Sequence, residues 1–144
     1  MKRNNSRVRA MIILYNYDLT KELDIEGISE IINNNIEEEF SIDIDFSNDL
    51  IRGVINNLSN IDELINNHLE NYTIDRLSYV DRNIIRLAVY EMLYLDHPIE
   101  IVINEYLNIS REFTQIENYD TVKFNNAVLD KIANMKRLND NAGW

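Results

Sequence analysis

The sequence predicts an all-α protein, because three features of the chain favour helices over strands. Apolar residues recur at steps of three and four along almost its whole length, which places them on one face of a helix. Only 3 glycines and 1 proline occur in 144 residues, which leaves few residues for the tight turns of β-sandwiches and βαβ units. Apolar residues make up 45% of the chain, which is enough for a substantial core.

Three helices are expected before residue 70. The first begins with Ser6 as its N-cap, the second begins near Asp24, and the third covers residues 47–69. Gly53 lies in the middle of the third helix, where glycine costs about 1 kcal/mol relative to alanine, so we expect close helix packing there. Their apolar faces consist of Val8, Met11, Ile12, Tyr15 and Leu19, then Ile28, Ile31, Ile32 and Ile36, then Leu50, Val54, Leu58, Ile61 and Ile65.

Two stretches interrupt the helical spacing. Residues 40–46 alternate apolar and polar side chains, which is typical of a strand. Since no partner strand is predicted, we expect an extended connector there. Residues 70–73 break the pattern again and separate two halves of similar size. We therefore expect two packed three-helix subdomains, residues 1–71 and 72–144, within one compact domain.

Three longer helices are expected after the break. The first of them ends before Pro98, because proline cannot continue a helix. The last begins with Asp120 or Thr121 as its N-cap. The expected ranges are a short turn at 74–77, helices at 79–95, 100–113 and from 120 or 121 onwards, a polar loop at 114–118 and a frayed tail from 138.

The charge of the chain is unevenly distributed. The 14 basic and 25 acidic residues give a net charge of −11. Four cations and no acid fall within residues 1–10, whereas residues 11–71 contain 2 basic and 14 acidic residues. The acidic body argues against nonspecific coating of nucleic acid. The basic end can still form a local patch, because exposed charges more than about 8–10 Å apart are largely screened.

The sequence predicts no metal site, cofactor or catalytic centre. It contains no cysteine, and His68 and His97 have no partner at metal-ligand spacing. Asp43, Asp45 and Asp49 lack the glycine and terminal glutamate of a calcium loop. No apolar run approaches the about 18 residues of a membrane span, and the N-terminus lacks the apolar segment of a secretory signal. We therefore expect a cytoplasmic protein.

Three motifs of the second half occur in the order and spacing of a known family. They are VDRNIIRLAVYEML at 80–93, PIEIVINEYLNISREF at 98–113 and KFNNAVLDKI at 123–132, and Ala10, Leu14 and Tyr15 extend the likeness to the first helix. Together they resemble the NusB family of transcription antitermination factors. The matching residues in the three motifs are Arg82, Arg86, Tyr90, Glu91, Ile103, Asn104, Glu105, Phe124, Asn126, Leu129 and Asp130.

The resemblance implies a helical protein without catalytic activity. It implies binding to the boxA element of nascent rRNA leader transcripts together with NusE, a small-subunit ribosomal protein, within the RNA polymerase antitermination complex. The implied RNA-binding residues are Lys2, Arg3, Arg7, Arg9, Tyr15 and Asp120. The implied partner-binding residues are Tyr90, Glu91, Glu105, Phe124 and Asn126.

Two of these assignments have alternatives. Glu91 is expected either to contact a partner or to form an intramolecular salt bridge with Arg82, Arg86 or Arg111. The basic N-terminus is expected either to bind RNA, with Tyr15 available for base stacking, or to be solvated and disordered with Tyr15 in the core.

The chain also departs from the family pattern. Asn4 and Asn5 stand where members often have arginine, Asn125 replaces an apolar residue, and Ala127 replaces glycine.

A second function is compatible with the smaller number of N-terminal arginines and with the negative net charge. It is a helical protein-interaction module of ribosome biogenesis with weak or lost RNA binding. The domain fused to rRNA cytosine methyltransferases shares the fold, but such enzymes need a catalytic cysteine and a Gly-rich cofactor domain. Both a monomer and a homodimer suit the fold.

Overall fold

A computed structural model of the chain describes residues 2–35, 41–113 and 121–141. These residues form seven α-helices, a 3₁₀ turn and a π-helical turn, and they contain no strand, so the predicted all-α class is confirmed. The elements are α1 (Lys2–Thr20), α2 (Ile25–Asn35), α3 (Ile44–Asn56), α4 (Leu58–Asn67), η1 (Ile74–Arg76), α5 (Tyr79–Val89), η2 (Tyr90–Tyr94), α6 (Ile99–Phe113) and α7 (Thr121–Asn141).

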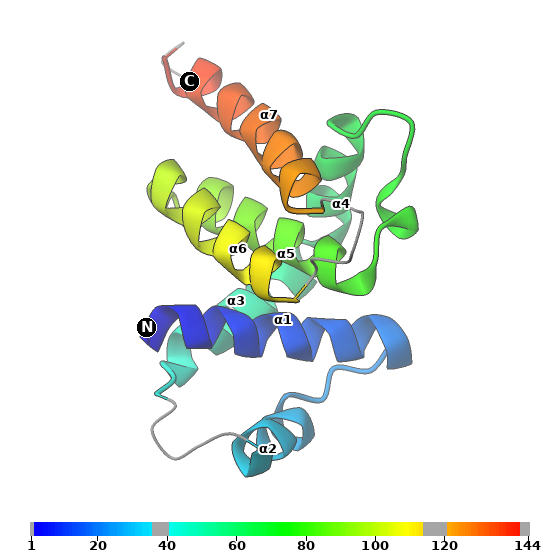
Figure 1. Cartoon of the computed structure of the whole chain (residues 1–144), viewed down its shortest axis with the longest axis vertical. Coiled ribbons are helices and arrows are strands. Elements are labelled where there is room, and N and C mark those ends of the chain that lie inside the picture. Colours follow the sequence, from blue (N-terminus) through cyan, green and yellow to red (C-terminus); the bar gives the residue numbers. More distant parts are fainter. Residues whose placement is uncertain (1, 36–40, 114–120, 142–144) are drawn as a thin grey trace.

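Helix α1 crosses the molecule and separates α2 from the helices of the second half (Figure 1). On its other side α1 packs against α5, and α6 and α7 follow, while α3 packs against both α1 and α5. One hydrophobic cluster runs through both halves of the chain and includes Leu14, Leu50, Ile85, Tyr106 and Leu129. Because both halves contribute to one core, the division at residue 71 stays a prediction.

Helix α5 is buried on all its sides. Every residue from Asp81 to Val89 is buried, because α1, α4, α6 and α7 surround the helix. Apolar periodicity predicts one buried stripe, whereas a fully enclosed helix also buries the residues between the stripes. Four of these are polar or charged, namely Asp81, Arg82, Asn83 and Arg86, and each hydrogen-bonds within the protein.

Two predicted helix starts are wrong. Ser6 is not an N-cap but lies inside α1, where its hydroxyl donates to the Lys2 carbonyl (2.7 Å) and accepts the Asp43 N–H (2.8 Å). The expected connector is helical from Ile44, because the Asp43 side chain caps α3 by accepting the N–H of Phe46 (3.1 Å). The expected connector is therefore wrong for residues 44–46, whereas residues 41–43 lie outside any helix and Asp43 is extended. Residues 36–40 lie outside the described residues.

Three other expectations on helix length are also wrong. The third helix divides at Asn57 into α3 and α4. The helix expected over 79–95 changes at Tyr90 into a π-turn, in which the N–H of Leu95 donates to the Tyr90 carbonyl (3.1 Å). The last helix continues to Asn141 instead of fraying from residue 138.

Gly53 allows α3 and η2 to approach each other closely. A Cβ atom on Gly53 would lie 1.9 Å from Cζ of Tyr90, far inside van der Waals contact. Tyr90 is itself buried and stacks on Tyr94 with 5.5 Å between the ring centroids. The close helix packing expected from a mid-helix glycine is therefore confirmed, and the Tyr90 ring is the group that requires it.

Replacing Gly53 with alanine is expected to destabilise the protein, although alanine favours a helix by about 1 kcal/mol. Forcing a methyl group into a packed core typically costs about 1–3 kcal/mol, because the Tyr90 ring must move. Urea unfolding followed by circular dichroism measures the change. The control Asn33→Ala, on the exposed face of α2, should leave the midpoint unchanged or raise it slightly. An unchanged midpoint for Gly53→Ala would contradict this packing.

Candidate nucleic-acid interface

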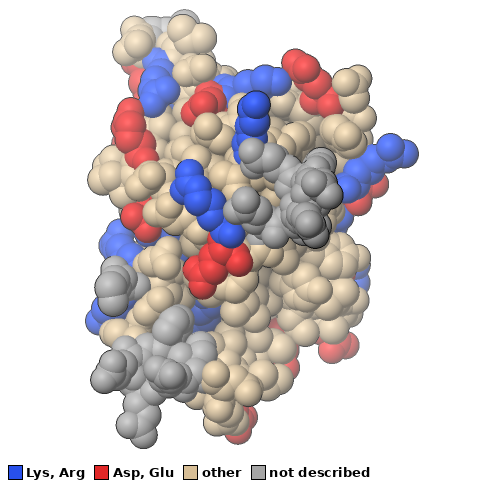
Figure 2. Space-filling view, viewed as in Figure 1, with Lys and Arg blue, Asp and Glu red and all other residues tan. Residues whose placement is uncertain are grey.

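The four cations at the start of α1 divide into two exposed and two buried groups. Lys2 and Arg3 are exposed, whereas Arg7 and Arg9 are 4% and 3% exposed. On the face shown in Figure 2, basic and acidic side chains of the described residues are interspersed rather than gathered into one broad basic patch. The folded protein therefore presents two cations of this segment to a phosphate chain, and direct RNA contact is not favoured for Arg7 or Arg9.

Arg7 forms a two-bond ion pair with Glu91, which is fully buried in the π-turn. Nε donates to Oε2 at 2.8 Å and Nη2 donates to Oε1 at 2.9 Å. The hydroxyl of Tyr106 donates to Oε2 at 2.5 Å, and Nδ1 of His97 lies 3.0 Å from Oε1. We refer to Arg7, Glu91, His97 and Tyr106 as the Glu91 cluster.

The ionised state of Glu91 is the one that the cluster favours. Burial raises the pKa of Glu91, but the hydrogen bond and charge of Arg7, with the bonds from Tyr106 and His97, outweigh burial and hold that pKa below its usual value. Burial and the Glu91 charge raise the pKa of Tyr106 well above its usual value, so its hydroxyl remains a donor.

The intramolecular salt bridge expected of Glu91 exists, but none of the three expected partners forms it. Arg86 instead pairs with two aspartates, Arg82 donates to backbone carbonyls, and Arg111 donates to a side-chain amide. Arg7 forms the bridge although it lies 84 residues away in sequence, a separation that residue spacing cannot reveal.

Arg9 ties α1 to α2 and α3 without a carboxylate partner. Its Nη1 donates to the Ser47 hydroxyl (2.7 Å) and to the Asn48 side-chain oxygen (2.9 Å), and Nη2 donates to the Ser29 hydroxyl (2.7 Å). Burial lowers the pKa of Arg9, but an arginine remains charged in proteins. Arg9 is therefore a buried cation that three neutral oxygens hold in place.

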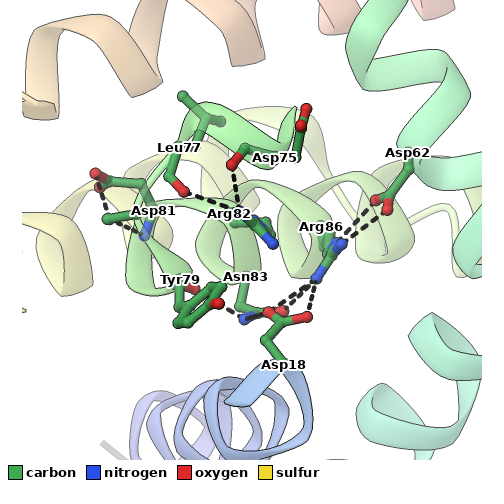
Figure 3. A network of polar contacts seen from close by, with 10 residues as sticks. Asp18, Asp62, Asp75, Leu77, Tyr79, Asp81, Arg82, Asn83 and Arg86 are labelled. Carbon is green, nitrogen blue, oxygen red and sulfur yellow. Dashed lines mark hydrogen bonds and ion pairs between the residues drawn. The ribbon is translucent and has the colours of Figure 1, made fainter. Parts of the chain in front are cut away.

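The second half of α1 carries the other buried ion pair and the aromatic candidate. Arg86 lies between Asp18 of α1 and Asp62 of α4, with Nη1–Oδ2 and Nη2–Oδ2 distances of 3.1 and 2.7 Å (Figure 3). Tyr15 is 38% exposed and meets Tyr79 edge to face, with 5.9 Å between the ring centroids. The interpretation of a disordered N-terminus with Tyr15 in the core is wrong, because α1 is helical from Lys2.

The residues expected to bind a protein partner differ in exposure. Tyr90 and Glu91 are buried, so their side chains present little surface to a partner. Glu105, Phe124 and Asn126 are half-buried. Glu105 lines a cavity of about 310 Å³ between the starts of α1 and α6. Asp120, the remaining RNA candidate, lies outside the described residues.

The described part of the chain contains neither a helix that could span a membrane nor a metal-binding cluster. None of its helices combines the length and apolar character needed to cross a membrane. Over the same residues, no group of three or more histidine, cysteine, aspartate or glutamate side chains is placed to hold a metal ion.

Comparison with known proteins identifies one family. The NusB family model matches residues 4–134. The transcription antitermination protein NusB of Bacillus cereus is 38% identical over 133 residues, which cover 92% of this chain and 97% of the relative. The NusB protein of Anaeromyxobacter dehalogenans is 33% identical over 132 residues, covering 92% of this chain and 90% of the relative.

Two solved structures share the fold. The structure of T. maritima NusB has a TM-score of 0.74 and 37% sequence identity, covering 93% of this chain and 92% of its own. A chain from a crystal structure of the antitermination factors NusB and NusE in complex with dsRNA has a TM-score of 0.73 and 27% identity, covering 91% of this chain and 95% of its own.

Glu91→Gln is expected to destabilise the protein by about 3–5 kcal/mol at neutral pH, the typical cost of leaving a buried charge without its partner. Because the pKa of Glu91 is depressed in the folded state, its charge stabilises the fold fully above the ordinary value of 4.5 and progressively less as the pH falls through the folded-state value. The difference between wild type and variant should therefore narrow below pH 4.5.

Urea unfolding over a series of pH values measures this difference. The control Glu70→Gln removes an exposed ion pair with Lys131 and should change stability little at any pH. A difference for Glu91→Gln that stays constant with pH would contradict the role of the ionised carboxylate.

Proposed function

Because the chain belongs to the NusB family, we propose that it is an RNA-binding transcription antitermination factor that acts together with NusE. The observation that carries this proposal is the extent of the match, which covers residues 4–134 and so includes most of α1 and the helices of both halves. NusB and NusE occur together with dsRNA in the complex of one structural neighbour. We propose boxA-type RNA of rRNA leader transcripts as the target, a cytoplasmic location and no enzymatic activity.

The RNA surface that we propose lies along α1. Lys2 and Arg3 supply positive charge near its start, and Tyr15 lies about 18 Å from Arg3 at a rise of about 1.5 Å per residue. Twelve residues are about 3.3 turns, so a strand that meets the cations at the start of α1 must also pass about 120° around the helix to reach the Tyr15 ring. Base stacking on such a ring is worth about 1–3 kcal/mol. Asp120 remains a candidate through the family resemblance alone.

The acidic body of the protein suits a basic protein partner. Residues 11–71 carry a net charge of −12, from 2 basic and 14 acidic residues, which repels phosphate but attracts a basic ribosomal protein and speeds its encounter. Glu105, Phe124 and Asn126 are the partner candidates that retain exposed surface. The partner then adds positive charge that two exposed cations do not supply by themselves.

One observation favours a second candidate function. Two of the four N-terminal cations are buried, which is also compatible with a helical protein-interaction module of ribosome biogenesis whose RNA binding is weak or lost. Both functions include a protein partner, so RNA binding in the presence of NusE separates them.

RNA binding by the chain alone is expected to be weak and only mildly salt-sensitive. Lys2 and Arg3 neutralise about two phosphates, so log K should fall with log salt at a slope near −0.7 × 2, or about −1.4. NusE should raise the affinity by about 10²–10⁴, because two weak RNA surfaces then act within one complex. Fluorescence anisotropy with a boxA-like RNA, with and without NusE, measures both quantities.

Charge reversal tests the RNA surface directly. The double variant Lys2→Glu/Arg3→Glu should weaken binding, whereas Lys131→Glu/Arg137→Glu, the same charge change at two exposed positions of α7, should not. If the double variant binds RNA as well as wild type when NusE is present, the start of α1 is not the RNA site. If NusE makes no difference to wild type, the cooperative mechanism fails.

Glu105→Lys is expected to slow association with NusE, because a charge at the rim of an interface acts mainly on the association rate. Stopped-flow or surface plasmon resonance at two salt concentrations measures the rate. The control Glu63→Lys makes the same charge change on an exposed position of α4. Equal effects of the two variants would remove Glu105 from the partner surface and leave only the general attraction of the acidic body.

A further inference from the structure

The ring of Phe46 lies at the meeting point of three positively charged or titratable side chains. Phe46 belongs to the first turn of α3 and is 9% exposed. The guanidinium carbon of Arg3 lies 4.3 Å from the ring centroid, and that of Arg7 lies 5.5 Å from it. The imidazole ring of His97 lies 6.2 Å away, tilted by 37°. Of these three groups only Arg3 is exposed.

The backbone that carries Phe46 is fixed to α1. Asp43, which caps α3, donates its own N–H to the Ser6 hydroxyl at 2.8 Å. The hydroxyl of Ser47 donates to the Ser6 carbonyl at 2.9 Å and accepts a hydrogen bond from Arg9 at 2.7 Å. Since Ser47 directly follows Phe46, these bonds hold the ring beside the first turns of α1. The backbone on either side of Phe46 is therefore fixed, and the ring, 9% exposed, has little room to move.

The two arginines at this ring differ in their hydrogen-bond partners. The Arg7 guanidinium is engaged by both carboxylate oxygens of Glu91. For Arg3, the described part of the chain provides the Phe46 ring as a contact but no hydrogen-bond acceptor and no carboxylate within ion-pair distance. The guanidinium carbon of Arg3 thus lies over the ring, while its N–H groups have no acceptor among the described residues. Bidentate phosphate binding uses those N–H groups.

We propose that Phe46 is a positioning residue for RNA binding, which holds the Arg3 guanidinium over its ring so that the guanidinium N–H groups meet a phosphate. A cation within about 6 Å of an aromatic centroid is attracted to the ring, and a side chain ordered before binding loses less entropy on binding. Two members of the Glu91 cluster, Arg7 and His97, lie beside the same ring. This role rests on the proposed function, because it requires Arg3 to contact RNA.

A double-mutant cycle tests the role. Phe46→Leu keeps an apolar side chain but removes the ring, and should weaken binding of a boxA-like RNA in the presence of NusE by about two- to fivefold. Arg3→Ala should weaken it at least as much and lower the salt slope by about 0.7. Combining both should cost no more than Arg3→Ala alone, because the ring acts only through Arg3. Phe46→Tyr, which keeps the ring, should restore binding.

Two controls separate positioning from loss of the fold. Phe113→Leu makes the same change at an exposed phenylalanine at the end of α6, outside the proposed RNA and partner surfaces, and should leave RNA affinity unchanged. Thermal unfolding of every variant reports stability independently. If Phe46→Leu does not fold, the ring-current shift of the Arg3 side-chain protons in wild-type protein provides the second measurement. A shift present with and without RNA supports the role, and its absence overturns it.

The outcomes distinguish this role from the proposed function. If Arg3→Ala binds RNA like wild type, the RNA surface at the start of α1 is wrong, and the role of Phe46 fails with it. If Arg3→Ala weakens binding but Phe46→Leu does not, or if the two losses add, the RNA surface stands and the positioning role is overturned.

Discussion

Two buried ion pairs of opposite polarity fix α1 in the molecule. Near its start α1 supplies the cation, Arg7, to Glu91, and near its end it supplies the anion, Asp18, to Arg86. A buried charge that loses its partner costs several kcal/mol. Sliding α1 by one turn or reversing its direction would therefore leave charges of both signs unpaired in the core. The pairs specify the register and direction of α1 against α5, which apolar contacts alone specify weakly.

This constraint also determines what α1 presents to a ligand. The turn that buries Arg7 necessarily brings Arg3, one turn earlier, beside the first turn of α3, where Phe46 lies. The cations of the N-terminal segment thus fall into two pairs. Arg7 and Arg9 are buried and bind α1 to other elements, whereas Lys2 and Arg3 face solvent. With few exposed cations on an acidic protein, nonspecific charge contributes little to affinity for RNA.

Local patterns predicted those parts of the structure that depend on local interactions. The helical class, the break at 70–73 and the close packing at Gly53 follow from spacing and composition. The ion pairs do not, because their members lie 84 and 68 residues apart. The apolar face expected for the first helix is wrong at Tyr15 and Leu19, which are exposed, whereas Ala10 and Leu14 are buried. Arg7 and Asp18 continue the buried row of Ala10 and Leu14 at steps of three and four. Charges at both ends of an apolar stripe indicate buried partners elsewhere in the chain.

The long separation between Arg7 and Glu91 has a consequence for synthesis. Helix α1 is made early, but residue 91 follows only after more than half of the 144-residue chain has been made, several seconds later at about 5–20 residues per second. Until then Arg7 lacks its Glu91 partner, whereas the partners of Arg9 are complete once residue 48 has been made. The nascent chain therefore offers nearby polyanions more positive charge than the finished protein does. As the helices assemble, folding buries Arg7 and Arg9 and removes their charges from the protein surface.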